Sequence, residues 1–159
     1  MPLSKRLAAI AALVRHDCRV ADIGTDHARL PIFLAESGRV ISAIAADIAA
    51  GPLNKARENI SAAGLGGKIE LVQSDGLKGI DPHAVDDIII AGMGGETVAD
   101  ILEAGGFEFL PNHRFILNPM SRPERLEARL KAADFEVIHH ETVTEGRRTY
   151  HIYIAKKQI

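Results

Sequence analysis

The sequence is poor in cysteine, which could form stabilising disulfides, and in large aromatic residues, which could fill a hydrophobic core. It has no tryptophan, five phenylalanines and two tyrosines, so aliphatic side chains must supply most of the core. Cys18 is the only cysteine, which excludes an internal disulfide and suits a reducing cytoplasm. No stretch approaches the roughly 20 apolar residues that span a bilayer. We therefore expect a single cytoplasmic domain over residues 1–159, with no membrane association.

Charge of one sign is not in large excess either. The net charge of −2 argues against a general nucleic-acid-binding protein. The distribution is uneven, because residues 112–159 hold nine basic and six acidic side chains, whereas residues 1–111 hold ten basic and fifteen acidic ones. The C-terminal third is therefore either a solvated surface of mixed charge or a modest electropositive face for a polyanion.

Short apolar runs alternate with segments of helical periodicity along the whole chain. We expect strands over residues 19–23, 40–46, 68–72, 87–91, 114–117, 136–143 and 149–155. We expect helices over residues 5–14, 28–36 (or from 31), 52–63, 96–104 and 123–133. This alternation predicts an α/β fold with a parallel sheet and helices on both faces.

The last two predicted strands break the alternation. Only residues 144–148 separate them, too few for a parallel crossover, so they must form an antiparallel hairpin. A mostly parallel, seven-stranded sheet that ends in such a hairpin is typical of Rossmann-like class I methyltransferases. The common nicotinamide-binding Rossmann domain is parallel throughout, so the hairpin disfavours it.

The first candidate ligand loop, residues 22–28, leads from a predicted strand into a helix. Gly24 allows close approach of a ligand, but Asp26 and Ala28 stand where a dinucleotide loop would have further glycines. Asp22 and Asp26 would repel a pyrophosphate, whereas they suit the ammonium and sulfonium of S-adenosylmethionine. We take Asp22, Gly24, Asp26 and His27 as candidate cofactor-binding residues. Asp26 could instead cap the following helix.

Acidic residues follow the next two predicted strands. Asp47 ends the second strand, where an acidic side chain accepts hydrogen bonds from ribose hydroxyls, although a solvated strand end is the alternative. Asp75 and Gly76 follow the third strand, where they would receive the adenine ring of the cofactor. An ordinary Asp-Gly turn is the alternative there.

Two further loops follow the fourth and fifth predicted strands. Gly92, Met93 and two more glycines form the first, and so many glycines are costly unless something approaches the backbone or the turn is very tight. Asn118 begins the second and offers a donor and an acceptor for a base edge, or simply forms an Asn-Pro turn. No histidine, cysteine or acidic spacing is typical of a metal site, and His139 and His140 would point to opposite faces of a strand.

At these residues the sequence resembles the TrmK family, bacterial tRNA adenine-N1 methyltransferases that act on adenine 22. The motifs that carry the resemblance are Leu3-Ser4-Lys5-Arg6-Leu7, residues 22–31, Gly51-Pro52, Asp75-Gly76-Leu77, residues 91–95 and Leu117-Asn118-Pro119. Two positions depart from the family pattern: Arg29 replaces a usual tyrosine, and Asn118 replaces a usual glutamine. Family members usually continue into a helical, coiled-coil domain, and this sequence stops near the end of the catalytic domain.

The resemblance implies S-adenosylmethionine as cofactor and tRNA as partner. It implies that Gly92, Met93 and Asn118 form the pocket for the acceptor base, and that Gly92 also contacts the cofactor. Asp26 would stabilise the positive charge that develops on that base or hold the cofactor tail. Asp26, Met93 and Asn118 are thus the candidate catalytic residues. The candidates for RNA phosphate contacts are Arg114, Arg122, Arg147 and Arg148. A methyltransferase for another acceptor, and a cofactor-binding module without activity, remain alternatives, and the sequence leaves the oligomeric state open.

Overall fold

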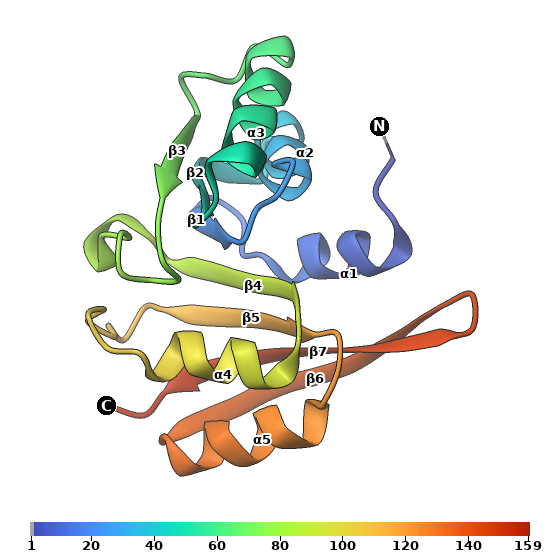
Figure 1. The fold of residues 1–159 in the computed structure, drawn as a ribbon, viewed down its shortest axis with the longest axis vertical. Helices are drawn as coiled ribbons and strands as arrows, with labels where there is room; N and C mark the ends of the chain where they lie inside the picture. The colour runs from blue at the N-terminus through green and yellow to red at the C-terminus, as the bar shows by residue number, and fades with distance from the viewer. Residues whose placement is uncertain (1) are drawn as a thin grey trace.

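The computed structural model describes residues 2–159 and contains one seven-stranded sheet (Figure 1). The strands are β1 (Cys18–Ile23), β2 (Val40–Asp47), β3 (Ile69–Gln73), β4 (Asp87–Met93), β5 (Arg114–Pro119), β6 (Phe135–Glu145) and β7 (Arg148–Lys157). Their order in the sheet is β3-β2-β1-β4-β5-β7-β6. The first five strands are parallel, and β7 is antiparallel to both of its neighbours. The predicted class I methyltransferase topology is confirmed.

Helices cover both faces of the sheet, as the alternating pattern predicted. They are α1 (Lys5–Leu13), α2 (Arg29–Glu36), α3 (Ala50–Ala62), α4 (Gly95–Glu103) and α5 (Pro123–Ala132), with a short 3-10 helix, η1 (Pro82–Ala84). Buried residues of α1, α2 and α3 share one apolar cluster with residues of the central strands, among them Val20 and Ile89. Buried residues of α4 and α5 share a second cluster with Ala21 and Ile90. Neighbouring strand residues therefore serve opposite faces, as the twofold alternation of a strand requires.

The C-terminal hairpin is longer than the sequence pattern indicated. β5 pairs with β7 only over Phe115–Leu117, so the turn-proximal half of the hairpin extends past the carboxyl edge of the sheet. In Figure 1 this overhang runs beyond the ends of β4 and β5 and passes below α1. The Glu145 carboxylate accepts a hydrogen bond from the backbone N–H of Arg6 at 3.1 Å. The overhang is thus attached to α1 as well as to the sheet.

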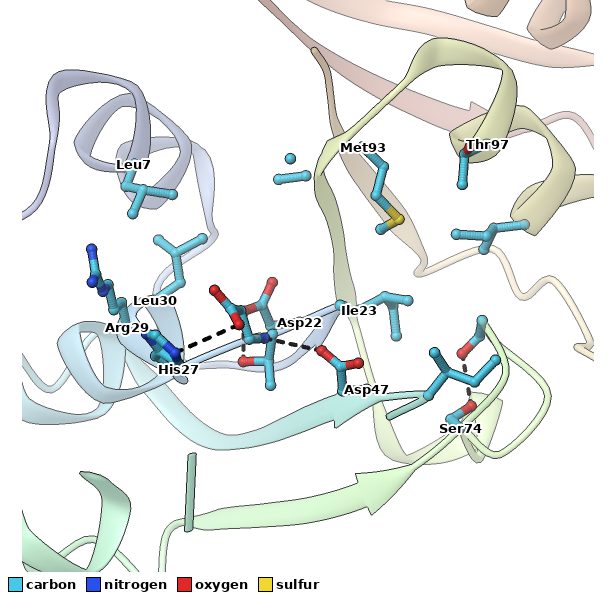
Figure 2. Close-up of a pocket in the computed structure, with 18 of the residues that line it drawn as sticks. Leu7, Asp22, Ile23, His27, Arg29, Leu30, Asp47, Ser74, Met93 and Thr97 are labelled. Atoms are coloured by element: carbon cyan, nitrogen blue, oxygen red, sulfur yellow. Dashed lines mark hydrogen bonds and ion pairs between the residues drawn. The ribbon is translucent and has the colours of Figure 1, made fainter. Parts of the chain in front are cut away.

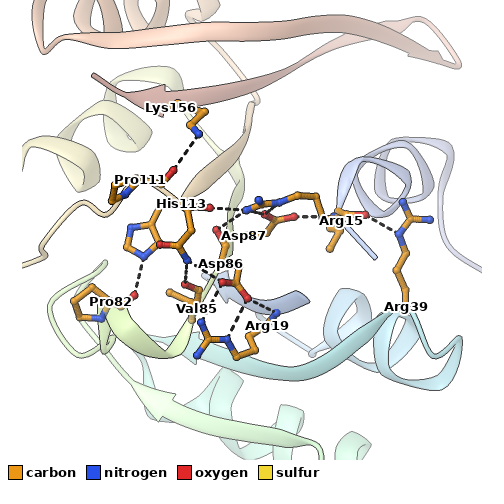
Figure 3. Close-up of polar contacts among 12 residues, drawn as sticks. Arg15, Arg19, Arg39, Pro82, Val85, Asp86, Asp87, Pro111, His113 and Lys156 are labelled. Atoms are coloured by element: carbon orange, nitrogen blue, oxygen red, sulfur yellow. Dashed lines mark hydrogen bonds and ion pairs between the residues drawn. The ribbon is translucent and has the colours of Figure 1, made fainter. Parts of the chain in front are cut away.

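At the opposite, amino edge of the sheet, two ion pairs join Arg15, which follows α1, and Arg19 of β1 to Asp87 and Asp86 at the start of β4 (Figure 3). Asp87, fully buried at the start of β4, accepts from the backbone N–H of Arg15 at 2.8 Å and from its Nε at 2.7 Å. Beside it, hydrogen bonds from Arg19 lower the pKa of the Asp86 carboxyl to about 2. Because a buried carboxylate is costly without partners, the contacts of Asp87 fix the segment that follows α1 against the start of β4.

Replacing Arg15 with alanine is expected to lower the free energy of unfolding by about 2 kcal/mol, because Asp87 then keeps a buried charge without its guanidinium partner. The guanidinium is itself 35% exposed, so the loss is smaller than for a fully buried pair. Urea unfolding at pH 7 measures the change. Lys55→Ala, which breaks an exposed pair with Glu58 in α3, is the control and should cost less than about 0.5 kcal/mol. Equal losses in both variants would contradict the assignment.

Within residues 2–159, the helices are too short or too polar to cross a lipid bilayer.

Candidate active site

A cleft of about 710 Å³ opens at the carboxyl edge of the sheet (Figure 2). It lies where the strand order reverses between β1 and β4, the place where open α/β sheets bind ligands. Its volume is within the range of pockets that hold a nucleotide-sized ligand. The residues that line it are Arg6, Leu7, Asp22, Ile23, Gly24, Thr25, Asp26, His27, Arg29, Leu30, Asp47, Ile48, Ser74, Asp75, Gly76, Ala91, Gly92, Met93, Thr97 and Ile101. All eight predicted cofactor-binding residues are among them.

The loop after β1 forms one wall of the cleft in an unusual backbone conformation. Gly24, Asp26 and Ala28 all have positive φ values, of 73°, 56° and 61°. The backbone N–H groups of Gly24 and Thr25 donate to the carbonyl of Ala46 in the neighbouring strand. Ala28 is the N-cap of α2, and no side chain caps this helix. The alternative that Asp26 caps the helix is therefore wrong, and its side chain stays 71% exposed at the cleft.

Gly24 also explains how the two glycine-containing loops fit together. A Cβ atom at Gly24 would lie 3.0 Å from the terminal methyl carbon of Met93, the last residue of β4. The positive φ favours glycine, and a larger residue there would also require the end of the Met93 side chain to shift. Figure 2 shows Met93 reaching into the cleft from the side opposite Leu30. The predicted catalytic residue Met93 and the first loop therefore share one pocket.

Asp22 is a buried carboxyl at the base of the cleft. It is 6% exposed, and the Thr25 hydroxyl donates to it at 2.9 Å. Burial raises the pKa of the Asp22 carboxyl to about 7, against the opposing effect of the Thr25 hydrogen bond, and the negative charge of Asp47 raises it further. A cation that enters the cleft would favour the ionised form of this carboxyl.

Asp47, which ends β2, holds the first loop in place. Its two carboxylate oxygens accept from the backbone N–H groups of Asp26 and Ala49, both at 3.2 Å. A carboxylate has about four lone-pair sites, so Asp47 retains capacity for ligand hydroxyls. In Figure 2 it lies close to Asp22 on the floor of the cleft, between His27 and Ser74.

The loop after β3 contributes Asp75 and Gly76 to the far end of the cleft. Asp75 is exposed and forms an ion pair with Lys78 at 3.5 Å. Gly76 has a φ of 59°, and a Cβ there would press against Ile101 of α4 at 3.3 Å. The Asp-Gly pair is thus a turn that also shapes the cleft.

The glycines at the end of β4 and at the start of α4 have two different roles. Gly92 lines the cleft with a φ of 82°, and nothing lies within 4 Å of the space that a Cβ would take. Gly95 is buried, and a Cβ there would lie 2.8 Å from the carbonyl oxygen of Ser121 and nearer still to that of Arg122. The two explanations considered for these glycines, close approach of a ligand and tight packing, therefore both apply. Gly92 keeps the cleft open, and Gly95 allows tight packing between α4 and the loop after β5.

Asn118 is not on the wall of the cleft, unlike the other predicted catalytic residues. It is fully buried, its side-chain oxygen accepts from Arg6 Nη1 at 2.7 Å, and its amide nitrogen donates to the His151 carbonyl at 2.9 Å. The side-chain oxygen and nitrogen of Asn118, which were predicted to contact a base edge, thus both have hydrogen-bond partners within the protein. Arg6, which the residue pattern did not single out as a site residue, lines the cleft in its place.

The four predicted RNA-contacting arginines do not share one surface. Arg122 follows β5 at the carboxyl edge, and Arg147 and Arg148 lie at the turn of the hairpin overhang. Arg114 begins β5 at the amino edge, and its buried Nε has no hydrogen-bond partner among the described residues. Arg114 therefore lies at the edge away from the cleft, and its contact with an RNA phosphate stays a prediction.

The histidines of the hairpin contact other side chains of the same hairpin. His139 lies 2.8 Å from Glu141, and His140 lies 2.8 Å from His151. Across residues 2–159, no three histidine, cysteine or acidic side chains gather in a way that could hold a metal ion.

Comparison with known proteins places this architecture in a family. Residues 3–153 match the model of the family described as "Methyltransferase domain". The chain is 34% identical, over 156 residues, to the tRNA (adenine(22)-N(1))-methyltransferase of Bacillus subtilis (strain 168). This alignment covers 98% of the chain and 66% of the relative, so the chain spans just under two thirds of that protein.

Solved structures agree with the sequence match. The structure of Streptococcus pneumoniae Sp1610, a putative tRNA (m1A22) methyltransferase, in complex with S-adenosyl-L-methionine superposes with a TM-score of 0.90 at 36% identity, over 99% of this chain and 75% of that one. M. capricolum TrmK in complex with S-adenosyl-homocysteine superposes with a TM-score of 0.84 at 30% identity, over 98% and 69% of the two chains. The chain therefore belongs to the methyltransferase domain family and, within it, to the TrmK family.

Proposed function

We propose that this chain is an S-adenosylmethionine-dependent methyltransferase that modifies N1 of an adenine in tRNA. The observation that carries the proposal is the acidic cleft at the switch point of the sheet, where four carboxylates surround a volume of about 710 Å³. Related structures in complex with S-adenosyl-L-methionine and with S-adenosyl-homocysteine support the same cofactor.

The side chains of the cleft suit the chemistry of this cofactor. Asp22 and Asp26 lie where carboxylates would attract its ammonium and sulfonium groups. Asp47 would accept hydrogen bonds from ribose hydroxyls while it holds the first loop, and Asp75 and Gly76 would receive the adenine ring. Gly24 has no side chain to cover its backbone, so a ligand can approach it closely. When bound, S-adenosylmethionine supplies a methyl group on a positively charged sulfur.

The protein needs to supply little acid–base chemistry for the methyl transfer itself. Adenine N1 has an in-plane lone pair and needs no general base, so orientation and exclusion of water supply most of the acceleration. Gly92 leaves room for a flat base beside the cleft, and Met93 offers it an apolar surface. The methylated base gains positive charge, which the exposed carboxylate of Asp26 would stabilise.

Contacts with tRNA are proposed for Arg122, Arg147 and Arg148, all at the edge of the sheet onto which the cleft opens. Neither Arg147 nor Arg148 forms an ion pair with another side chain in the described part of the chain, so both charges are available to phosphates. The Arg148 guanidinium lies over the Tyr150 ring, 5.4 Å from its centre.

Methyl transfer from labelled S-adenosylmethionine to bulk tRNA, followed by nucleoside analysis, tests this proposal. We expect the label in 1-methyladenosine, and we expect Asp47→Ala to abolish its incorporation because the first loop loses its anchor. Label in another nucleoside or in protein would overturn the acceptor. Cofactor binding without labelling of any acceptor would identify a binding module without activity and overturn the proposal.

A further inference from the structure

The overhang of the C-terminal hairpin, residues 141–152, has two unlike faces, because side chains alternate along both of its strands. One face packs against α1: Val143 joins the apolar cluster that contains residues of α1, and the Arg6 guanidinium lies over the Tyr150 ring, 5.7 Å from its centre. The opposite face, here called the outer face, is largely exposed. Its members are the exposed Thr142, Thr144 and Thr149, the half-buried His151, and the exposed His140 at the root of the overhang.

The polar side chains of the outer face bond only to one another within residues 2–159. The hydroxyl oxygens of Thr144 and Thr149 lie 3.2 Å apart across the two strands. His140 Nε2 lies 2.8 Å from His151 Nδ1. Each hydroxyl has one hydrogen and each neutral imidazole has one N–H, so these contacts leave donors for a ligand.

The two histidines are held in place by a buried tyrosine. The Tyr153 side chain is fully buried, and its hydroxyl donates to the Glu127 carboxylate of α5 at 3.1 Å. The His140 ring stacks on the Tyr153 ring at 4.3 Å and 17°, and His151 is hydrogen-bonded to His140. Whichever ring donates in the neutral pair, one of the two outer nitrogens, Nδ1 of His140 or Nε2 of His151, carries a second N–H. Neither outer nitrogen has a partner among the described residues.

The charges of the overhang are divided between its faces. Its two carboxylates, Glu141 and Glu145, both lie on the face toward α1, where Glu145 accepts from the backbone N–H of Arg6. The outer face therefore has no carboxylate, and the turn beside it carries the cations Arg147 and Arg148. Donors without carboxylates suit an anion, and the absence of aliphatic side chains on the outer face disfavours a protein partner, whose interface would need an apolar centre.

The overhang lies where a strand of RNA would leave the cleft. Residues 148–152 of β7 continue past the last residue that pairs with β5, and at 3.3 Å per residue they reach about 17 Å beyond it. The cleft opens at this same carboxyl edge of the sheet (Figures 1 and 2). An RNA strand that places one base in the cleft must carry its neighbouring phosphates along this edge.

We propose that the outer face of the overhang binds the sugar-phosphate backbone of the substrate tRNA. The His140–His151 pair and the threonine hydroxyls donate to phosphate oxygens, and Arg147 extends the surface at the turn. The inference rests on the proposed function, because it takes tRNA as the substrate. It goes beyond that proposal by assigning RNA contacts to uncharged side chains of the hairpin.

Binding of labelled bulk tRNA, followed by fluorescence anisotropy at constant salt, tests the inference with two variants. Thr149→Glu places a carboxylate on the outer face and should weaken tRNA binding about tenfold, because it repels phosphates. His140→Phe keeps a ring stacked on Tyr153 but removes the ring nitrogens, and loss of hydrogen bonds to a charged phosphate should also weaken binding about tenfold.

Ser61→Glu is the matched control, because it makes the same change from a hydroxyl to a carboxylate at an exposed position of α3. It should alter tRNA binding less than about twofold, since a distant exposed charge is screened by salt. All three variants should unfold cooperatively and bind S-adenosylhomocysteine as the wild type does in calorimetric titration.

Unchanged tRNA binding in both Thr149→Glu and His140→Phe would overturn the inference. A parallel loss of S-adenosylhomocysteine binding in these two variants would do the same, because it would show that the outer face only supports the fold. If the wild-type chain binds S-adenosylhomocysteine but no tRNA, it is the proposed acceptor that fails.

Discussion

Replacing Asp22 with asparagine is expected to stabilise the folded chain at pH 8 by up to about 4 kcal/mol. Burial raises the pKa of this carboxyl from 3.8 to about 7, so the folded chain keeps a proton that the unfolded chain releases. Wild-type stability should therefore fall, relative to the variant, as the pH rises from about 4 to 7, and the difference should stay constant above 7. Asparagine keeps an oxygen that can accept from the Thr25 hydroxyl.

Urea unfolding of both proteins between pH 4 and 8 measures this effect. Asp17→Asn, at an exposed aspartate with a φ of 56° that asparagine tolerates, is the matched control and should show no such pH-dependent gain. We expect the stabilised Asp22→Asn variant to bind S-adenosylhomocysteine at least about tenfold more weakly, because the cationic end of the ligand loses a charged partner. A variant that is less stable than the wild type at pH 8 would contradict the account of Asp22.

Replacing Gly95 with alanine is expected to destabilise the chain by about 3 kcal/mol. The added methyl group would lie 2.8 Å from the Ser121 carbonyl oxygen and closer to that of Arg122. Both are backbone atoms that no side-chain rotation can move away. The Gly95 N–H also donates to Ser121 at 2.7 Å, so relief of the clash would break this link between α4 and the loop after β5.

Gly51→Ala is the matched control for Gly95→Ala, because Gly51 lies within α3 and nothing stands within 4 Å of its missing Cβ. There, alanine should stabilise the helix by about 0.5–1 kcal/mol. Urea unfolding of the two variants should give shifts of opposite sign. If Gly95→Ala were as well tolerated as Gly51→Ala, the tight packing after β4 would be disproved.

Much of this fold could be predicted from the sequence because its signals are local. The Asp-Ile-Ile-Ile-Ala run at 87–91 is apolar enough to require burial on both faces, and the five residues between the last strands permit only a hairpin. The length of the hairpin could not be predicted in this way. Its overhang is held by α1 through Glu145 and Arg6, a contact between residues 139 positions apart.

The residues of the site also fall into two groups: those whose position follows from the local sequence pattern, and those whose position depends on contacts with residues distant in the sequence. Asp22, Asp47 and Gly92 were predicted to line the cleft because each lies at the carboxyl end of a strand, and parallel strands bring these ends to one edge. Asn118 also lies at the carboxyl end of a strand, but its side chain is bound by Arg6 and His151, which a local sequence pattern does not show. For the same reason Arg6, in a helix that precedes the first strand, gave no sign of facing the cleft.

The Asp26 capping alternative failed for a backbone reason. Asp26 and Ala28 both adopt positive φ values, so the loop turns before α2 begins, and the N-cap position passes to a residue without a polar side chain. Sequence propensity favours aspartate at an N-cap, but it does not register such a turn. The result is a carboxylate left at the mouth of the cleft.

Calorimetric titration of the wild-type chain with S-adenosylhomocysteine and with NAD tests the central claim most directly. The acidic cleft should bind S-adenosylhomocysteine in a one-to-one complex, and binding should be much weaker for NAD, whose pyrophosphate would meet Asp22 and Asp26. Tighter binding of NAD, or no binding of S-adenosylhomocysteine, would contradict the assignment of this cleft to a methyl-transfer cofactor.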